Sequence, residues 1–141
     1  GLALAIIAGR VSDRIGRKRT TFFVVSIAGM GFALFYSGVG GVWLPPLWVL
    51  SFFGFFSGEA MIAGFAMEIV PTHYRATVSA LRYVAEIGTG AVSLALEGRL
   101  YDHFHGHGPA IQLLLIAVPI TLAAILFLPE PAGKTLEEMA A

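Results

Sequence analysis

Long apolar runs separated by short polar clusters dominate this chain and limit the folds open to it. The runs, the first of them partial, are 1–8, 20–37, 47–70, 77–96 and 110–128. Each complete run approaches the roughly 20 residues that a helix needs to cross a hydrocarbon core. Open strands would leave backbone groups unpaired in lipid, so the runs must be helices. The sequence therefore predicts an all-α membrane protein, a transmembrane helix bundle followed by a tail at 129–141.

Composition excludes several other classes of protein. Hydrophobic residues make up 57% of the chain and charged residues only 13%, whereas globular domains in water carry about 25% charged residues. The formal net charge is +0, so no bulk attraction to nucleic acid is expected. The absence of cysteine excludes disulfides and thiolate chemistry. No nucleophile with a paired base and no complete metal cluster is evident, so the sequence predicts neither an enzyme nor a cofactor.

The distribution of basic residues predicts how the bundle is oriented. The first loop, the third loop and the tail hold most of them: Arg10, Arg14, Arg17, Lys18, Arg19, Arg75 and Lys134. The second loop has none, and the fourth has only Arg99. Because cytoplasmic loops are enriched in Lys and Arg, these loops and the C-terminus are expected in the cytoplasm. The prediction is a multi-pass protein of the plasma or inner membrane.

The first loop, between Gly9 and Arg19, carries one acid and five bases. Its simplest interpretation is a solvated positive-inside loop. Alternatively, Asp13 caps a helix or pairs with a base, and the arginines bind carboxylates or phospholipid head groups. The pattern G-x-x-x-D-R-x-G-R-K at 9–18 resembles the loop motif of the major facilitator superfamily, which occurs between helices two and three and again between helices eight and nine.

Two further patterns are similar to the sugar-porter and metabolite-proton-symporter branch of that superfamily. E-x-x-P-T-x-x-R at 68–75 resembles the pattern after the tenth helix. L-P-E-P-A-G-K-T-L-E-E at 128–138 resembles the tail motif, although Pro131 and Ala132 replace the usual Thr and Lys. The three motifs occur in the family's order, each on the predicted cytoplasmic face.

The resemblance implies that 1–141 run from the end of helix eight through helix twelve of a twelve-helix fold. The N-terminal half would then be missing, and the fragment alone would not be competent, because the solute site lies between two halves. The implied function is secondary active transport, proton-coupled, of a small organic solute such as a sugar or an organic or aromatic acid. The partners would be this solute, protons, the lipid bilayer and the missing half. A non-transporting solute sensor on the same scaffold and an inactive truncated product are the alternatives.

The resemblance also implies a charge network at the cytoplasmic face that gates transport without touching solute. Its members would be Gly9, Asp13, Arg14, Gly16, Arg17, Glu68 and Arg75. Such a network would latch one state of the transporter and break when the helices rock. A purely structural role is the alternative.

Three ionisable residues inside the apolar runs are candidates for solute and proton binding. Glu59 lies near the middle of 47–70, where a lone charge costs at least about 2.5 kcal/mol. Since burial disfavours an ionised carboxylate, Glu59 suits reversible proton binding, or it stays protonated against a neighbouring helix. Arg82 and Glu86 share one helix face. They form either an intrahelical ion pair, or a site in which Arg82 binds an anionic solute and Glu86 takes a proton.

Other residues carry weaker signals. Gly54 and Gly58 have a spacing typical of helix packing, and Pro119 predicts a kink in the last run. The phenylalanines of the runs are expected to pack or face lipid, and one or two can stack on a ring-shaped solute. The alternating histidines lack a fourth ligand at good spacing beyond Asp102, which favours a solvated loop over a metal site: His103, His105 and His107.

Overall fold

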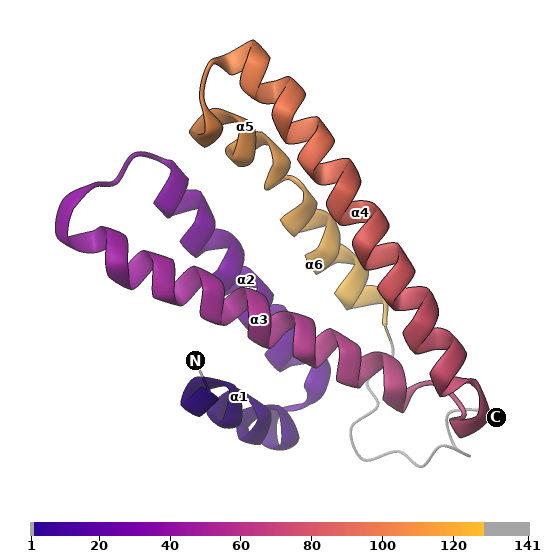
Figure 1. Cartoon of the computed structure of the whole chain (residues 1–141). Coiled ribbons are helices and arrows are strands. Elements are labelled where there is room, and N and C mark those ends of the chain that lie inside the picture. The colour runs from indigo at the N-terminus through magenta and orange to yellow at the C-terminus, as the bar shows by residue number, and fades with distance from the viewer. Residues whose placement is uncertain (1, 129–141) are drawn as a thin grey trace.

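The computed structural model describes residues 2–128, and within them all regular structure is helical. The helices are α1 (Leu2–Ile15), α2 (Arg17–Tyr36), α3 (Leu44–Glu68), α4 (Arg75–Phe104), α5 (His107–Leu114) and α6 (Ala117–Phe127). Short 3₁₀ turns precede α3 and α4: η1 (Gly41–Trp43) and η2 (Thr72–Tyr74). In Figure 1, α2 and α3 form one hairpin, and α4 returns through α5 and α6 as a second. The predicted all-α fold class is confirmed.

Three helical stretches are long and apolar enough to cross a membrane: Arg17–Tyr36, Gly41–Glu68 and His107–Phe127. The fourth predicted run, 77–96, lies inside the 30-residue α4, which is not among these stretches. At 1.5 Å per residue α4 is about 45 Å long, which is sufficient for a span. Its charged residues, among them Arg82 and Glu86, make it less apolar than the other three.

The first predicted loop is almost entirely helical. Gly9, the first residue of that loop, lies within α1, and a methyl group there would meet nothing within 4 Å. Gly16 alone separates α1 from α2, with φ at 108°, a conformation that other residues rarely adopt. The loop motif is therefore a sharp corner between two helices, and its basic residues project from helical turns on either side.

The last apolar run breaks into α5 and α6 at Leu115 and Ile116. The break lies four residues before Pro119, whose ring clashes with the carbonyl four positions earlier and which has no N–H to offer it. The Leu115 carbonyl instead accepts a hydrogen bond from the Val118 N–H at 2.9 Å. The kink predicted from Pro119 is present, and its position follows from proline chemistry.

The closest helix pair is α2 with α3, and small residues line it. A methyl group added to Gly54 would lie 2.9 Å from the backbone nitrogen of Ala28, and one added to Gly31 would lie 2.5 Å from Ser51 Oγ. Gly58 faces Val25 across the same contact. The spacing of Gly54 and Gly58 thus marks an observed helix contact, as in other membrane helices.

Two buried hydroxyl groups donate to a carbonyl four positions earlier in the chain. Ser51 Oγ donates to the Leu47 carbonyl at 2.6 Å, and Thr20 Oγ1 donates to the Gly16 carbonyl at 2.9 Å. Large apolar side chains, by contrast, cover the outside, as Met30 and Phe127 illustrate at 66% and 89% exposed. Helices in lipid are expected to place small and hydroxyl-bearing residues inside the bundle and large apolar residues outside, as these do.

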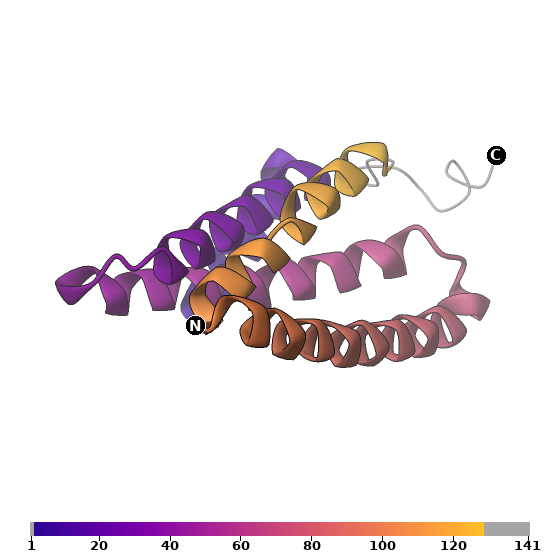
Figure 2. The ribbon, with the colours of Figure 1, turned by 90° about the horizontal axis from the view of Figure 1, so that it is seen from above.

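The long helix α4 runs along one edge of the bundle (Figure 2) and contains no buried residue. Val84, Ile87 and Leu94 are each more than 60% exposed, at 68%, 66% and 73%. Apart from α5, the other helices contact α4 only sparsely, so most of its surface is left for another neighbour or for lipid.

Candidate functional site

An open cavity of about 750 Å³ lies between α2, α3, α4 and the α5–α6 segment. Its wall is mostly apolar, with Phe32, Phe52 and Phe55 among the lining residues. The Phe32 ring packs edge-on against both others, with centroid distances of 5.5 and 6.4 Å. Apolar cavities of about 300–1,000 Å³ with a few polar groups are typical of small-molecule sites. The phenylalanines that line this cavity could not be singled out in the sequence.

All three ionisable residues predicted inside the apolar runs line this one cavity: Glu59, Arg82 and Glu86. Arg82 Nη1 lies 3.1 Å from Glu86 Oε2, one turn away on α4. Their side chains are 26% and 44% exposed, so the pair is open to the cavity. The Arg82 guanidinium carbon also lies 5.6 Å from the Tyr83 ring centroid, within cation–π range. An ion pair on one helix face is therefore present, and it also reaches the cavity.

Glu59 projects from α3 and is partly buried. Within residues 2–128 it makes no hydrogen bond or ion pair. A carboxylate in an apolar wall without a partner is costly unless it takes a proton or meets a ligand. Of the three ionisable groups that line the cavity, Glu59 is therefore the one with a carboxylate left for a ligand among residues 2–128.

Two hydroxyl groups of the cavity wall are already bound to backbone. Thr89 Oγ1 donates to the Ala85 carbonyl at 2.8 Å, and Thr121 Oγ1 donates to the Ala117 carbonyl at 2.9 Å. Each hydroxyl oxygen keeps acceptor lone pairs. The cavity can thus accept one or two hydrogen bonds besides those of its charged groups.

A second cluster joins the corner between α1 and α2 to the end of α3. Arg17 Nη2 lies 2.8 Å from Glu68 Oε1 and 3.4 Å from Asp13 Oδ1. Three of the predicted network residues are therefore in contact, with Arg17 in the centre. The Arg17 and Glu68 side chains are 36% and 34% exposed, so their pairing is only partly screened by solvent.

Other predicted network residues lie apart from this cluster. Arg75 Nε donates to the Val70 carbonyl at 3.4 Å and so holds the turn between α3 and α4. Arg14 makes no hydrogen bond or ion pair within the described chain, 2–128. The tail motif lies outside the described residues, except for its first residue, Leu128.

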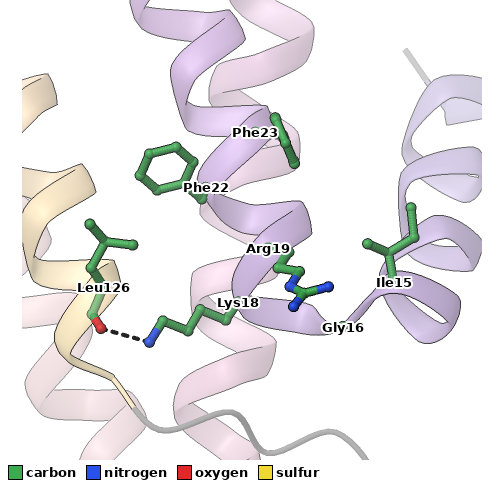
Figure 3. A pocket seen from close by; sticks show the side chains of 7 residues that line it. All are labelled: Ile15, Gly16, Lys18, Arg19, Phe22, Phe23 and Leu126. Carbon is green, nitrogen blue, oxygen red and sulfur yellow. Dashed lines mark hydrogen bonds between the residues drawn. The ribbon is translucent and has the colours of Figure 1, made fainter.

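Sequence reasoning did not find two contacts that join distant segments. Lys18 Nζ donates to the Leu126 carbonyl at 2.6 Å (Figure 3) and to the Leu128 carbonyl at 2.9 Å. These two bonds tie the start of α2 to the end of α6. A lysine is a suitable partner for the last carbonyls of a helix. His107 Nδ1 lies 2.6 Å from Glu97 Oε1 and so links α5 to α4. Within residues 2–128, no group of three metal-ligating side chains occurs.

Comparison with known proteins adds one match. A family model described as Major Facilitator Superfamily matches residues 1–139. No curated protein and no solved structure gives a significant match.

Proposed function

The chain belongs to the major facilitator superfamily, and from that premise we propose that it moves a small organic solute by proton-coupled secondary transport. Membership makes it an integral membrane transporter. The solute class we propose is a sugar or an organic or aromatic acid. The observation that carries this proposal is the convergence of Glu59, Arg82 and Glu86 on one apolar cavity.

The charges of this cavity suit exchange between a proton and a solute. One guanidinium and two carboxylates leave one negative charge when all are ionised, and none after one carboxylate takes a proton. Glu59 is the carboxylate without a partner among residues 2–128, so it would bind the proton. Arg82, held toward the cavity by Glu86, would then be available to orient an acidic or hydroxyl-rich solute.

The Arg17 cluster would act as a latch at the cytoplasmic side. Arg17 bridges the first corner and the end of α3 through Asp13 and Glu68. These helices must separate slightly when a transporter rocks between its two open states, and rupture of the ion pairs would accompany that motion. The concentration of bases at this end supports its cytoplasmic location.

A second helical bundle would complete the solute path. The cavity is open, and α4 contains no buried residue. Transporters of this class bind solute between two bundles. We therefore propose that α4 contacts the other bundle of the functional transporter.

Uptake into proteoliposomes tests the proposal. The full-length transporter is supplied with labelled hexoses and with labelled aliphatic and aromatic carboxylates, with and without an inward proton gradient. We expect accumulation of at least one solute, and its loss when a protonophore collapses the gradient.

Glu59→Gln should abolish accumulation but keep solute exchange at equal pH, because exchange needs no net proton movement. Asp102→Asn, a carboxylate change outside the cavity, is the control. Accumulation by Glu59→Gln equal to that of the parent would refute the coupling role.

A further inference from the structure

A second hollow lies at the first turns of α2, before the residues of that helix that line the solute cavity. This groove, of about 700 Å³, is formed by the first turns of α2, the end of α1 and the end of α6. Its apolar wall contains Ile15, Phe22, Phe23 and Leu126, and its basic residues are Lys18 and Arg19 (Figure 3). Neither the solute path nor the Arg17 cluster uses these side chains, except that Lys18 anchors α6.

The groove combines exposed apolar surface with positive charge. Ile15, Phe23 and Leu126 are 53%, 63% and 57% exposed. Arg19 is exposed and makes no hydrogen bond or ion pair within residues 2–128. In Figure 3, Lys18 extends toward α6 and Arg19 toward α1, so cationic groups flank the apolar wall on both sides. The one acid of the adjoining corner, Asp13, already pairs with Arg17.

The groove also lies at a definite depth. It begins where two stretches suited to span a membrane start or end, Arg17–Tyr36 and His107–Phe127. At this boundary, head groups of lipid meet the first methylenes of the acyl chains. An amphiphile with an anionic head would place its charge beside Arg19 and its chains against Phe22 and Phe23. A free anion would leave the apolar wall uncovered.

We propose that this groove binds an anionic phospholipid, with the phosphate group at Arg19 and the acyl chains along Phe22, Phe23 and Leu126. The proposal rests on membrane insertion and not on the solute or on proton coupling. A bound lipid here would bridge α1, α2 and α6 at the corner that carries the Arg17 cluster. It would thereby link the lipid composition of the membrane to the latch.

Quenching by brominated lipids tests the site. Phe23→Trp places a fluorescent reporter in the groove, with Trp43→Phe and Trp48→Phe removing the native tryptophans. The full chain is reconstituted in phosphatidylcholine containing either brominated phosphatidylglycerol or brominated phosphatidylcholine in equal amounts. We expect stronger quenching by the anionic lipid. Arg19→Gln should reduce the preference about fivefold, as expected for one basic side chain worth about 1 kcal/mol near an anionic surface.

Arg10→Gln removes the same charge from α1 outside the groove, and it should leave the preference unchanged. Equal quenching by both lipids would overturn the proposal. So would relief of quenching by millimolar inorganic phosphate, which would indicate a free-anion site. A preference that emerges only after Glu130, Glu137 and Glu138 are changed to Gln would overturn it too, since the tail would then be the occupant.

A second measurement avoids the reporter. The unmodified protein is stripped of lipid, offered equal amounts of phosphatidylglycerol and phosphatidylcholine, and examined by native mass spectrometry. Retention of the anionic lipid by the parent and by Arg10→Gln, with loss in Arg19→Gln, supports the groove as its site. Equal retention by all three proteins contradicts it.

Discussion

At the scale of single residues, the pair of Arg82 and Glu86 has two separable roles. As an ion pair it lowers the cost of placing two charges beside apolar side chains. As part of the cavity wall it offers a guanidinium and a carboxylate to a ligand. Single substitutions remove both roles together, whereas a double substitution removes only the second.

We predict that Arg82→Gln and Glu86→Gln each lower the yield of folded protein. Each leaves one charge unpaired, at a cost of about 2.5–3.5 kcal/mol near the bilayer centre. The double variant should recover the parent's thermal stability but not its uptake. Stability is measured by thermal unfolding in detergent and uptake in proteoliposomes. Recovery of uptake in the double variant would show that the pair is purely structural.

Arg17 and Glu68 make a matched test of the latch. Arg17→Gln and Glu68→Gln should each shift the transporter toward the cytoplasm-open state, detected as faster labelling of a cysteine placed in the cavity. The charge swap Arg17→Glu with Glu68→Arg should restore the parent's labelling rate only in part, because Asp13 then faces a like charge one turn away. The coupling energy is expected at about 1 kcal/mol, because both side chains are partly exposed. Arg14→Gln, which removes an arginine of the same corner, is the control, and an effect equal to that of Arg17→Gln would refute the assignment.

Residue identities could be predicted here better than residue contacts. A charge inside an apolar run is visible in the sequence, so Glu59, Arg82 and Glu86 were found without a structure. Their convergence on one cavity depends on the rotation of α3 and α4 about their axes, which no local pattern determines. The sequence identifies Lys18 only as a base of the loop motif. The two carbonyls that it binds lie 108 and 110 positions further along the chain, too far for a local pattern to reveal them.

At the scale of helices, the α2–α3 contact depends on the absence of side chains. Gly54→Ala should lower the free energy of unfolding by about 1–3 kcal/mol, because the added methyl group would meet the backbone of Ala28. Gly64→Ala, in the same helix with only the Arg17 Nη1 atom at 4.0 Å from the new methyl group, should be neutral or stabilising, because Ala favours a helix over Gly. Both variants are followed by thermal unfolding of the purified protein. Equal effects at the two positions would mean that close packing does not set the stability of this pair.

Helix existence was predictable and helix ends were less so. Apolar runs locate the helices, because lipid demands an apolar surface of a given length. The runs carry no information on polar residues that continue a helix beyond the hydrocarbon layer. The ends of α4 at Phe104 and of α1 at Ile15 therefore lie beyond the predicted runs. The corner at Gly16 and the break before Pro119 follow from backbone chemistry, although the first was expected as a longer loop.

At the scale of the whole molecule, what covers the outer face of α4 decides whether this bundle is complete by itself or needs a partner bundle. Val84 on α4 and Met30 on α2 are similarly exposed, at 68% and 66%. Residues 1–141 contain no cysteine, so within them single cysteines report on these positions without background. If a second bundle covers α4, a lipid-soluble maleimide should label Met30→Cys in membranes but not Val84→Cys.

The same two variants test whether the protection of Val84→Cys from labelling comes from burial or from a low intrinsic reactivity of the thiol at that position. After unfolding in detergent and denaturant, both cysteines should react at equal rates, because the protection of Val84→Cys comes from a neighbouring bundle. Equal labelling in the native membrane would place the outer face of α4 against lipid. The cavity would then have to be closed by the helices described here, and the proposed path between two bundles would be wrong. Protection of Val84→Cys together with solute protection of a cysteine at Thr89 would instead connect the covered face and the cavity to one transport path.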